Sequence, residues 1–436
     1  MTAAETFAPA PTDEDAERWL DREGGRLCAH GVSLEGIAAA VGTPFYAYSA
    51  PALRARYAML VAAVGPLGVA VCFAVKACSN IHVLAELARL GCGMDIVSGG
   101  EMRRALAAGC PAGRIIFSGV GKTSAEIRAA LEVGLHQINV ESPAELEMVA
   151  EVARDLGVRA PVALRVNPDV DARTHAKITT GRKDSKFGIP FDQIPALYAN
   201  APPEVKMVGL AVHIGSQILD LGPFRQAWSV LADLVRRLRA EGLRVERLDL
   251  GGGLGVGAEG KADPDLAEYA AIIAETVGGL DLALNVEPGR WLCARAGVMV
   301  TEVLYCKAGE DADVVIVDAA MNDLMRPALY DARHPIRTLH VPRLGAGGRP
   351  CRLVGPICES SDDFGVYDDL GQIVRGDLLA FGDAGAYGAA MSSTYNSRDL
   401  IPEVLVDEGQ FRIIRHRAGI RDLLKLEQGG PWQRAD

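Results

Sequence analysis

The sequence predicts a (β/α)8 barrel of the TIM type, followed by a second, mostly β domain. Eight short apolar runs typical of buried strands alternate with segments of helical spacing between Val69 and Val286. Polar or glycine-rich clusters follow six of these runs, and barrel enzymes build their active sites at the carboxyl ends of their strands. An open doubly wound sheet is the alternative, and the repeated position of these clusters favours the barrel.

The eight predicted strands share a short, apolar and β-branched character. They are Val69–Val75, Met94–Val97, Arg114–Phe117, Gln137–Val140, Val162–Val166, Val208–Ile214, Val245–Leu250 and Leu282–Val286. Helices are predicted between them at Ile81–Leu90, Gly100–Ala108, Ser124–Glu132, Pro143–Leu156, Phe224–Glu241 and Pro264–Val277. We expect Ser124 and Ser142 to cap helices at their amino ends, and Gly91, Gly109 and Gly134 to follow the last helical turns.

After Arg290 the pattern changes to strands separated by Gly, Pro and Asp turns, and no regular helix is expected there. The predicted strands are Val298–Cys306, Val314–Asp318, Leu378–Phe381, Glu403–Val406 and Phe411–His416. The chain is thus expected to divide into three parts. Residues 1–49 form a tail and a strand, Phe45–Tyr48, that contributes to the β domain; residues 50–290 form the barrel; residues 291–436 form the β domain.

Composition narrows the classes of function. The 436 residues are 49% hydrophobic and 23% charged with a net charge of −11, which is typical of a globular protein and unfavourable for binding nucleic acid. The acidic start of the chain does not resemble a secretory signal, and Gly65-Pro66 interrupts the longest uncharged run, so no membrane segment is expected. Nine cysteines without a CxxC pair suit a reducing cytoplasm, and no metal site is expected.

Lys76 stands directly after the first predicted strand, in the run Phe73-Ala74-Val75-Lys76-Ala77. Taken alone, it could be a solvated charge just past a strand. In an apolar setting, the ammonium would lose hydration and its pKa would fall, which would free an amine to attack an aldehyde. The position is therefore a candidate for a Schiff-base lysine.

Three further clusters follow later strands. The glycines at 251–253 could form a tight turn or could bind a phosphate through backbone N–H groups. Glu287 could be an ordinary ion-pair partner, or it could keep a pyridine nitrogen protonated, while Arg290 offers a planar fork for a carboxylate. His213 could be structural or could stack on a flat cofactor.

Ten motifs, in order along the chain from about residue 43 to residue 424, resemble the group IV pyridoxal-phosphate-dependent decarboxylases, and most closely those that act on diaminopimelate. They are AVKA around Lys76, GMDIVSGGE at 93–101, RVNP at 165–168, SKFG at 185–188, HIGSQ at 213–217, GGGLG at 251–255, EPGR at 287–290, MNDLMRPALY at 321–330, GPICESSD at 355–362 and GAYG at 385–388. One departure is Cys78, which stands where the family usually has asparagine.

The resemblance implies an alanine-racemase-like barrel, a C-terminal β domain, and a homodimer with shared active sites that binds pyridoxal 5′-phosphate. It implies that Lys76 is the Schiff-base lysine and that Cys358, from the partner subunit, is the proton donor. The implied cofactor contacts are Lys76, Asp95, His213, Ser216, Gly253, Glu287, Pro288, Gly289, Arg290 and Tyr387. The implied substrate contacts are Arg290, Arg326, Tyr330, Glu359 and Tyr387.

The expected reaction is decarboxylation of meso-2,6-diaminopimelate to L-lysine and CO2. Glu359 can pair with the distal ammonium of this substrate, and an arginine with its distal carboxylate. A substrate without that carboxylate would leave a buried arginine unpaired, which lowers binding. The alternatives are decarboxylation of another diamino acid, such as ornithine, arginine or a D-amino acid, and an inactive homologue that regulates a partner.

Overall fold

The computed structural model describes residues 19–430, except 173–174, 179, 182–184, 259–260, 343–348 and 369. The contacts divide these residues into two compact units. Unit 1 is Ala50–Ala296, and unit 2 combines Trp19–Ser49 with the residues from Gly297 onward.

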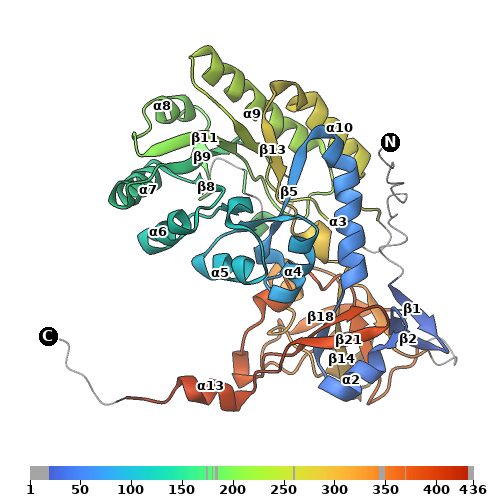
Figure 1. Ribbon diagram of the computed structural model, residues 1–436. Coiled ribbons are helices and arrows are strands. Elements are labelled where there is room, and N and C mark those ends of the chain that lie inside the picture. The colour runs from blue at the N-terminus through green and yellow to red at the C-terminus, as the bar shows by residue number, and fades with distance from the viewer. Residues whose placement is uncertain are drawn as a thin grey trace, which may run out of the picture. The chain divides into compact units, whose positions relative to one another are not determined.

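Unit 1 is a closed barrel of eight parallel strands (Figure 1). The strands are β5 (Val69–Ala74), β6 (Gly93–Ile96), β7 (Ile115–Phe117), β8 (Gln137–Val140), β9 (Ala160–Asn167), β11 (Val205–Ala211), β12 (Arg247–Asp249) and β13 (Ala283–Val286). Pairing of β13 with β5 closes the sheet, and the short β10 (Ile189–Pro190) adds to β9. The predicted barrel is confirmed, and each predicted strand corresponds to one of its eight strands.

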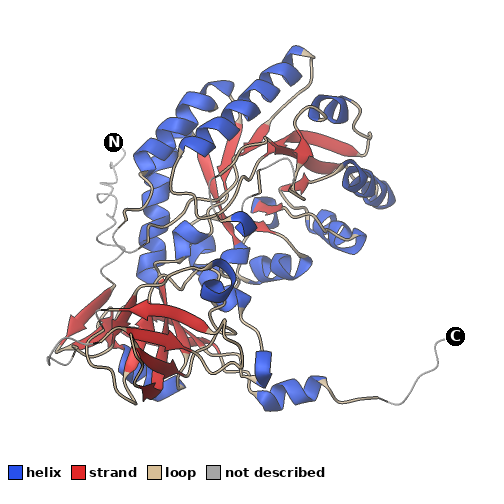
Figure 2. Cartoon of the chain, turned by 180° about the vertical axis from the view of Figure 1, so that it is seen from behind, coloured by secondary structure: helices blue, strands red, loops and turns tan. Residues whose placement is uncertain are grey.

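Helices lie around the outside of the strands (Figure 2). They are α3 (Ala50–Val64), α4 (Ile81–Arg89), α5 (Gly99–Ala107), α6 (Ser124–Val133), α7 (Pro143–Leu156), α8 (Ile194–Ala199), α9 (Gly222–Ala240), α10 (Leu266–Thr276) and α11 (Arg290–Cys293). Ser142 caps α7 as predicted. The prediction for Ser124 is wrong by one residue, because Thr123 caps α6 and forms a capping box with Glu126.

Unit 2 is mostly β. Its main sheet has the order β18-β17-β15-β14-β4-β20-β21, and β19 pairs with both β14 and β16. The strands of this unit are β1 (Leu20–Glu23), β2 (Arg26–Ala29), β3 (Val32–Ser33), β4 (Phe45–Ser49), β14 (Gly297–Lys307), β15 (Asp313–Val317), β16 (Ile336–Thr338), β17 (Cys351–Val354), β18 (Asp363–Tyr367), β19 (Leu378–Phe381), β20 (Glu403–Asp407) and β21 (Gln410–Arg415). Strand β4, from the N-terminal segment, lies between β14 and β20.

Unit 2 also contains helices, namely α2 (Leu34–Val41), α12 (Arg326–Tyr330) and α13 (Ile420–Leu426). The expectation that regular helices are lacking after Arg290 is therefore wrong. Pro327 stands in the first turn of α12, where a missing N–H costs nothing and the fixed φ favours a helix. Across the described residues, no helix combines the length and the apolar character that crossing a bilayer requires.

A buried ion pair anchors α3 within unit 1. Arg56 is fully buried, and its guanidinium lies 2.8 Å from Oδ2 of Asp263 and 3.7 Å from the centre of the Trp291 ring. Arg295 holds the other oxygen of the same carboxylate at 2.7 Å. The two arginines lower the pKa of Asp263 below its usual value although burial opposes this.

Replacing Arg56 by alanine is expected to lower the free energy of unfolding by about 3 kcal/mol, because removal of one partner of a buried pair leaves the other poorly compensated. Because the pKa of Asp263 is lowered in the folded protein, its contribution is present at neutral pH and is lost as the pH falls through that lowered value. Urea unfolding followed by tryptophan fluorescence measures both effects. An Arg56→Ala protein with an unchanged midpoint, or one with an unchanged acid dependence, would contradict this account of Asp263.

Candidate active site

The carboxyl ends of the barrel strands surround a cavity of about 170 Å3 in unit 1. Its lining residues come from the ends of seven of the eight strands and from the segment after β9. They are Lys76, Val97, Ser118, Gly119, Asn139, Arg165, Thr180, Phe187, Ala211, Val212, His213 and Glu287. Three of the predicted site residues, Lys76, His213 and Glu287, thus lie on one cavity at the expected rim of the barrel.

Lys76 lies in a short 3-10 turn, Val75–Ala77, directly after β5. Its Nζ is 2.9 Å from Oδ2 of Asp95, on the neighbouring strand β6. The Asp95 side chain is fully buried, and its Oδ1 has no hydrogen-bond partner among the described residues. Cys78 is buried, and its N–H donates to the carbonyl of Val75. This hydrogen bond spans the turn that carries Lys76 and fixes its backbone.

Two buried carboxyl groups face each other beside this lysine. Asp249 ends β12 and accepts hydrogen bonds from the Asn139 side chain, at 2.8 Å, and from the Gly251 N–H, at 3.0 Å. It also shares a hydrogen bond with Glu287, which follows β13. Burial, and then the negative charges of Asp249 and Asp95, raise the pKa of Glu287 well above its usual value. The hydrogen bond shared with Asp249 raises the pKa of Glu287 further. Oε1 of Glu287 has no hydrogen-bond partner among the described residues.

His213 is held as a neutral imidazole. The N–H of Gly252 donates to its Nδ1 at 3.1 Å, which leaves the ring proton on Nε2. Loss of hydration, and then the positive charges of Lys76 and Arg165, lower the pKa of His213 well below its usual value. The ring thus adds no charge to the mouth of the barrel.

The glycine cluster brings three strand ends close together. A Cβ on Gly252 would lie 2.0 Å from the carbonyl oxygen of Glu287, and one on Gly253 would lie 2.5 Å from that of Gly215. Any side chain at either position would force the backbones apart. Gly253 also has φ +109°, a conformation that other residues rarely adopt.

The segment at 287–290 is packed against the turn that carries Lys76. A Cβ on Gly289 would lie 2.9 Å from that of Ala77, and the carbonyl of Pro288 accepts from the N–H of Ala74. Arg290 begins α11, is buried, and donates to Oγ of Ser216 at 3.1 Å. The structure thus brings the predicted residues Arg290 and Ser216 together.

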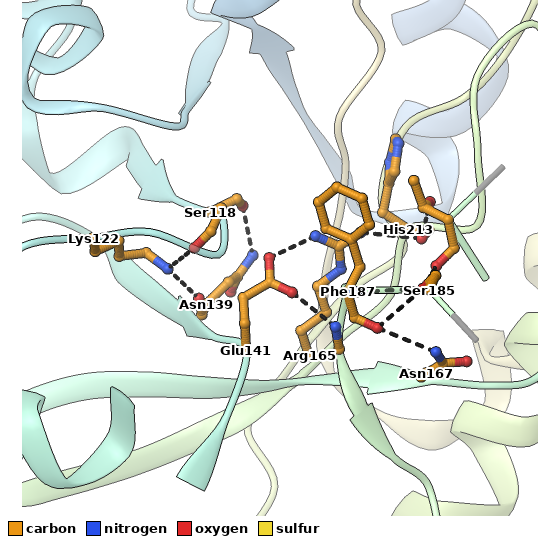
Figure 3. A network of polar contacts seen from close by, with 12 residues as sticks. Ser118, Lys122, Asn139, Glu141, Arg165, Asn167, Ser185, Phe187 and His213 are labelled. Carbon is orange, nitrogen blue, oxygen red and sulfur yellow. Dashed lines mark hydrogen bonds and ion pairs between the residues drawn. The ribbon is translucent and has the colours of Figure 1, made fainter. Parts of the chain in front are cut away.

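Figure 3 shows a polar network at this site that includes residues, such as Arg165 and Glu141, to which the sequence analysis assigned no role. Arg165 donates to Glu141 at 2.6 Å and to the carbonyl of His213 at 3.2 Å, and its guanidinium lies 4.9 Å from the centre of the Phe187 ring. Oε2 of Glu141 accepts from the N–H of Gly188 at 2.9 Å. An arginine within the apolar run Val162–Val166 was the available signal, because a charge in a buried strand needs a partner.

The remaining predicted residues belong to unit 2. Arg326 and Tyr330 lie on α12, and Arg326 contacts Nε2 of His334 at 3.0 Å. Cys358 and Glu359 are exposed neighbours, while Tyr387 has a positive φ of 55°. Among the described residues, no group of three His, Cys, Asp or Glu side chains is arranged to hold a metal ion.

The chain is similar to known proteins along almost its whole length. Residues 52–294 match the family model described as pyridoxal-dependent decarboxylase, pyridoxal binding domain. Diaminopimelate decarboxylase from Pseudomonas aeruginosa is 50% identical over 399 residues, which cover 91% of this chain and 95% of that protein.

Two solved structures are also similar to the chain, and both contain L-lysine. Diaminopimelate decarboxylase from Helicobacter pylori has a TM-score of 0.86 at 39% identity, covering 90% of this chain and 99% of the other. The enzyme from M. jannaschii has a TM-score of 0.88 at 34% identity, covering 95% and 99%.

Proposed function

The chain belongs to the diaminopimelate decarboxylases, within the pyridoxal-dependent decarboxylases, and from this premise we propose how its residues carry out the reaction. It decarboxylates diaminopimelate to L-lysine and CO2 with pyridoxal 5′-phosphate as cofactor. The observation that carries this conclusion is the identity of 50% over 91% of the chain.

The residues at the barrel mouth fit this cofactor. Oε1 of Glu287 and Oδ1 of Asp95 are buried polar atoms without a hydrogen-bond partner among the described residues, on or beside the cavity. Three buried carboxyl groups, those of Asp95, Asp249 and Glu287, contact or lie near the Lys76 amine. Because the acidic groups outnumber this one base, a cofactor ring with a positive charge would be stabilised here. The site therefore favours a group that is positively charged at its nitrogen and has an aldehyde within reach of Lys76.

We assign the cofactor contacts as follows. Lys76 is the amine that joins the aldehyde, and Asp95 holds and orients that amine. Glu287 accepts from the ring nitrogen, and His213 packs on the ring as a neutral side chain. The residues assigned to the phosphate and its surroundings are Ser216, Gly253, Pro288, Gly289, Arg290 and Tyr387.

When bound, pyridoxal phosphate would supply an electron sink for the electron pair that remains when CO2 leaves. Glu287 keeps the ring nitrogen protonated, so that developing negative charge is stabilised. Cys358 would return a proton to the α-carbon. The Lys76 amine would give way to the substrate amine at the start of the cycle and would displace the product amine at its end. Glu359 pairs with the distal ammonium, and the other assigned substrate contacts are Arg290, Arg326, Tyr330 and Tyr387.

We further propose that the two compact units act as separate domains, with the cofactor in the barrel. The protein is proposed to act in the cytoplasm as a homodimer, in which Cys358 of the partner subunit completes each site. The exposed thiol of Cys358 is consistent with this role, because a proton donor must reach a substrate from the surface of its own unit.

The substrate assignment is tested by CO2 release from a panel of diamino acids with added cofactor. We expect meso-diaminopimelate to give L-lysine and CO2 at a kcat/KM at least a hundredfold above that of ornithine, arginine or D-lysine, because these lack the distal carboxylate. Faster turnover of any of these would contradict the specificity while leaving the chemistry intact. Absence of CO2 from every substrate would favour the inactive regulatory homologue.

A further inference from the structure

The loop that carries Cys358 and Glu359 is anchored by a buried carboxylate. Asp362 is 3% exposed, and its two oxygens accept from the N–H groups of Ile357 and Met321, each at 2.7 Å. The N–H of Asp362 in turn donates to the carbonyl of Glu359. The backbone on both sides of Glu359 is therefore tied to the segment that precedes α12.

A second segment, at 393–398, is tied to the same place. The backbone N–H of Ser393 donates to the carbonyl of Asn322, whose side chain donates back to Ser393 at 3.1 Å. Arg398 donates to the carbonyl of Asp318. Between these anchors the chain turns sharply through Asn396, whose φ is +54°. Tyr395 and Asn396 are thus held against the loop at 357–361.

Contacts between the two segments reach the predicted functional residues directly. Oδ1 of Asn396 accepts from the N–H of Cys358 at 3.2 Å. The hydroxyl of Tyr395 donates to Oε1 of Glu359 at 2.5 Å, and the hydroxyl of Ser361 donates to Oε2 at 2.9 Å. These two hydroxyls lower the pKa of Glu359. Both carboxylate oxygens are held in place, and each keeps a lone pair for a further donor.

We infer that Tyr395 is a specificity-determining residue, whose hydroxyl fixes the Glu359 carboxylate in the position that receives the distal ammonium of the substrate. The inference rests on the proposed function of Glu359. An exposed glutamate side chain samples many rotamers. A hydroxyl that holds it in one rotamer before the substrate arrives reduces the side-chain entropy that is lost on binding. Tyr395 acts through Glu359, which is assigned to the distal ammonium of the substrate, so it is a positioning residue for substrate binding rather than for chemistry.

The test is Tyr395→Phe, which removes one oxygen atom from a side chain that is 44% exposed. We expect KM for meso-diaminopimelate to rise about tenfold while kcat changes less than twofold, because one charge-assisted hydrogen bond is lost and the reacting centre is untouched. Tyr305→Phe is the matched control, since Tyr305 is an exposed tyrosine of β14 in the same unit. The control is expected to leave both constants unchanged.

A double variant separates this role from a general structural effect. Glu359→Gln alone should raise KM, and adding Tyr395→Phe to it should raise KM no further, because the hydroxyl then has no carboxylate to position. Independent, multiplicative effects would overturn the inference, as would an unchanged KM in Tyr395→Phe. If Glu359→Gln itself leaves KM unchanged, the proposed role of Glu359 fails and the inference fails with it.

A pH profile gives a readout that a change in folding would not move. Loss of the Tyr395 hydroxyl should raise the pKa of Glu359, so the rise of KM in acid should begin at a higher pH in Tyr395→Phe than in the native protein. Among the described residues, the hydroxyls of Tyr395 and Ser361 contact Glu359, and Cys358 acts electrostatically on Tyr395. A profile identical to that of the native protein would contradict the inference.

Discussion

Replacing Lys76 by alanine is expected to abolish turnover, with a fall in kcat on the order of 10⁴-fold or more, because the covalent amine of the site is lost. The visible absorbance of the bound cofactor should disappear with it. Among the described residues, Lys76 is the lysine that lines the cavity at the carboxyl ends of the strands. The amine comes from a closed turn after β5 and is held 2.9 Å from a fully buried carboxylate.

The matched control is Lys206→Ala. Lys206 is an exposed lysine that pairs with Glu246, and it lies at the amino end of β11, whereas the cavity lies at the carboxyl ends of the strands. It should retain full activity and the full cofactor band. Because Lys76→Ala leaves the buried Asp95 without its amine, the double variant Lys76→Ala with Asp95→Asn provides a well-folded reference. A visible cofactor band that persists in both Lys76 variants would show that another lysine holds the cofactor.

Replacing Glu287 by alanine is expected to lower kcat about a hundredfold, equivalent to about 3 kcal/mol in the chemical step. The side chain presents Oε1 beside the cavity, while Asp249 engages it through a hydrogen bond. Without it, the ring nitrogen loses the acidic partner that keeps it protonated, and the electron pair left by CO2 is less stabilised.

Steady-state kinetics of Glu287→Ala should show the loss in kcat rather than in KM, since the interaction matters most in the transition state. Glu268→Ala, in the first turn of α10, is a suitable control for loss of an acidic side chain in the same unit. Near-normal turnover in Glu287→Ala would contradict the assigned role.

The barrel could be predicted because its strands are buried and parallel, so that each reads as a continuous apolar run. Strand β8 and helix α7 begin and end at the predicted residues, Gln137–Val140 and Pro143–Leu156. Strands β16 to β18 were not predicted, because they are short and half-exposed and lack such a run. The amino-terminal cap of α6 lies one residue before the predicted Ser124, because the hydroxyl of Thr123 accepts a hydrogen bond from the N–H of Glu126 and so caps the helix.

The candidate site could be predicted only in part. Lys76, His213 and Glu287 follow predicted strands, and a barrel brings such positions to one rim. Asp249 and Arg165 were not singled out, because their importance depends on partners more than 20 residues away in the chain. Nothing in the residues around Tyr395 indicates a function, because its hydroxyl contacts Glu359, which lies in a loop far away in the sequence.

Reduction with borohydride in the presence of pyridoxal phosphate, followed by peptide mapping, tests the central claim most directly. The treatment makes permanent the bond between the cofactor and the lysine that carries it. We expect one labelled peptide, containing Phe73-Ala74-Val75-Lys76, with the label on Lys76. A label on any other lysine, or no labelled peptide at all, would contradict the account.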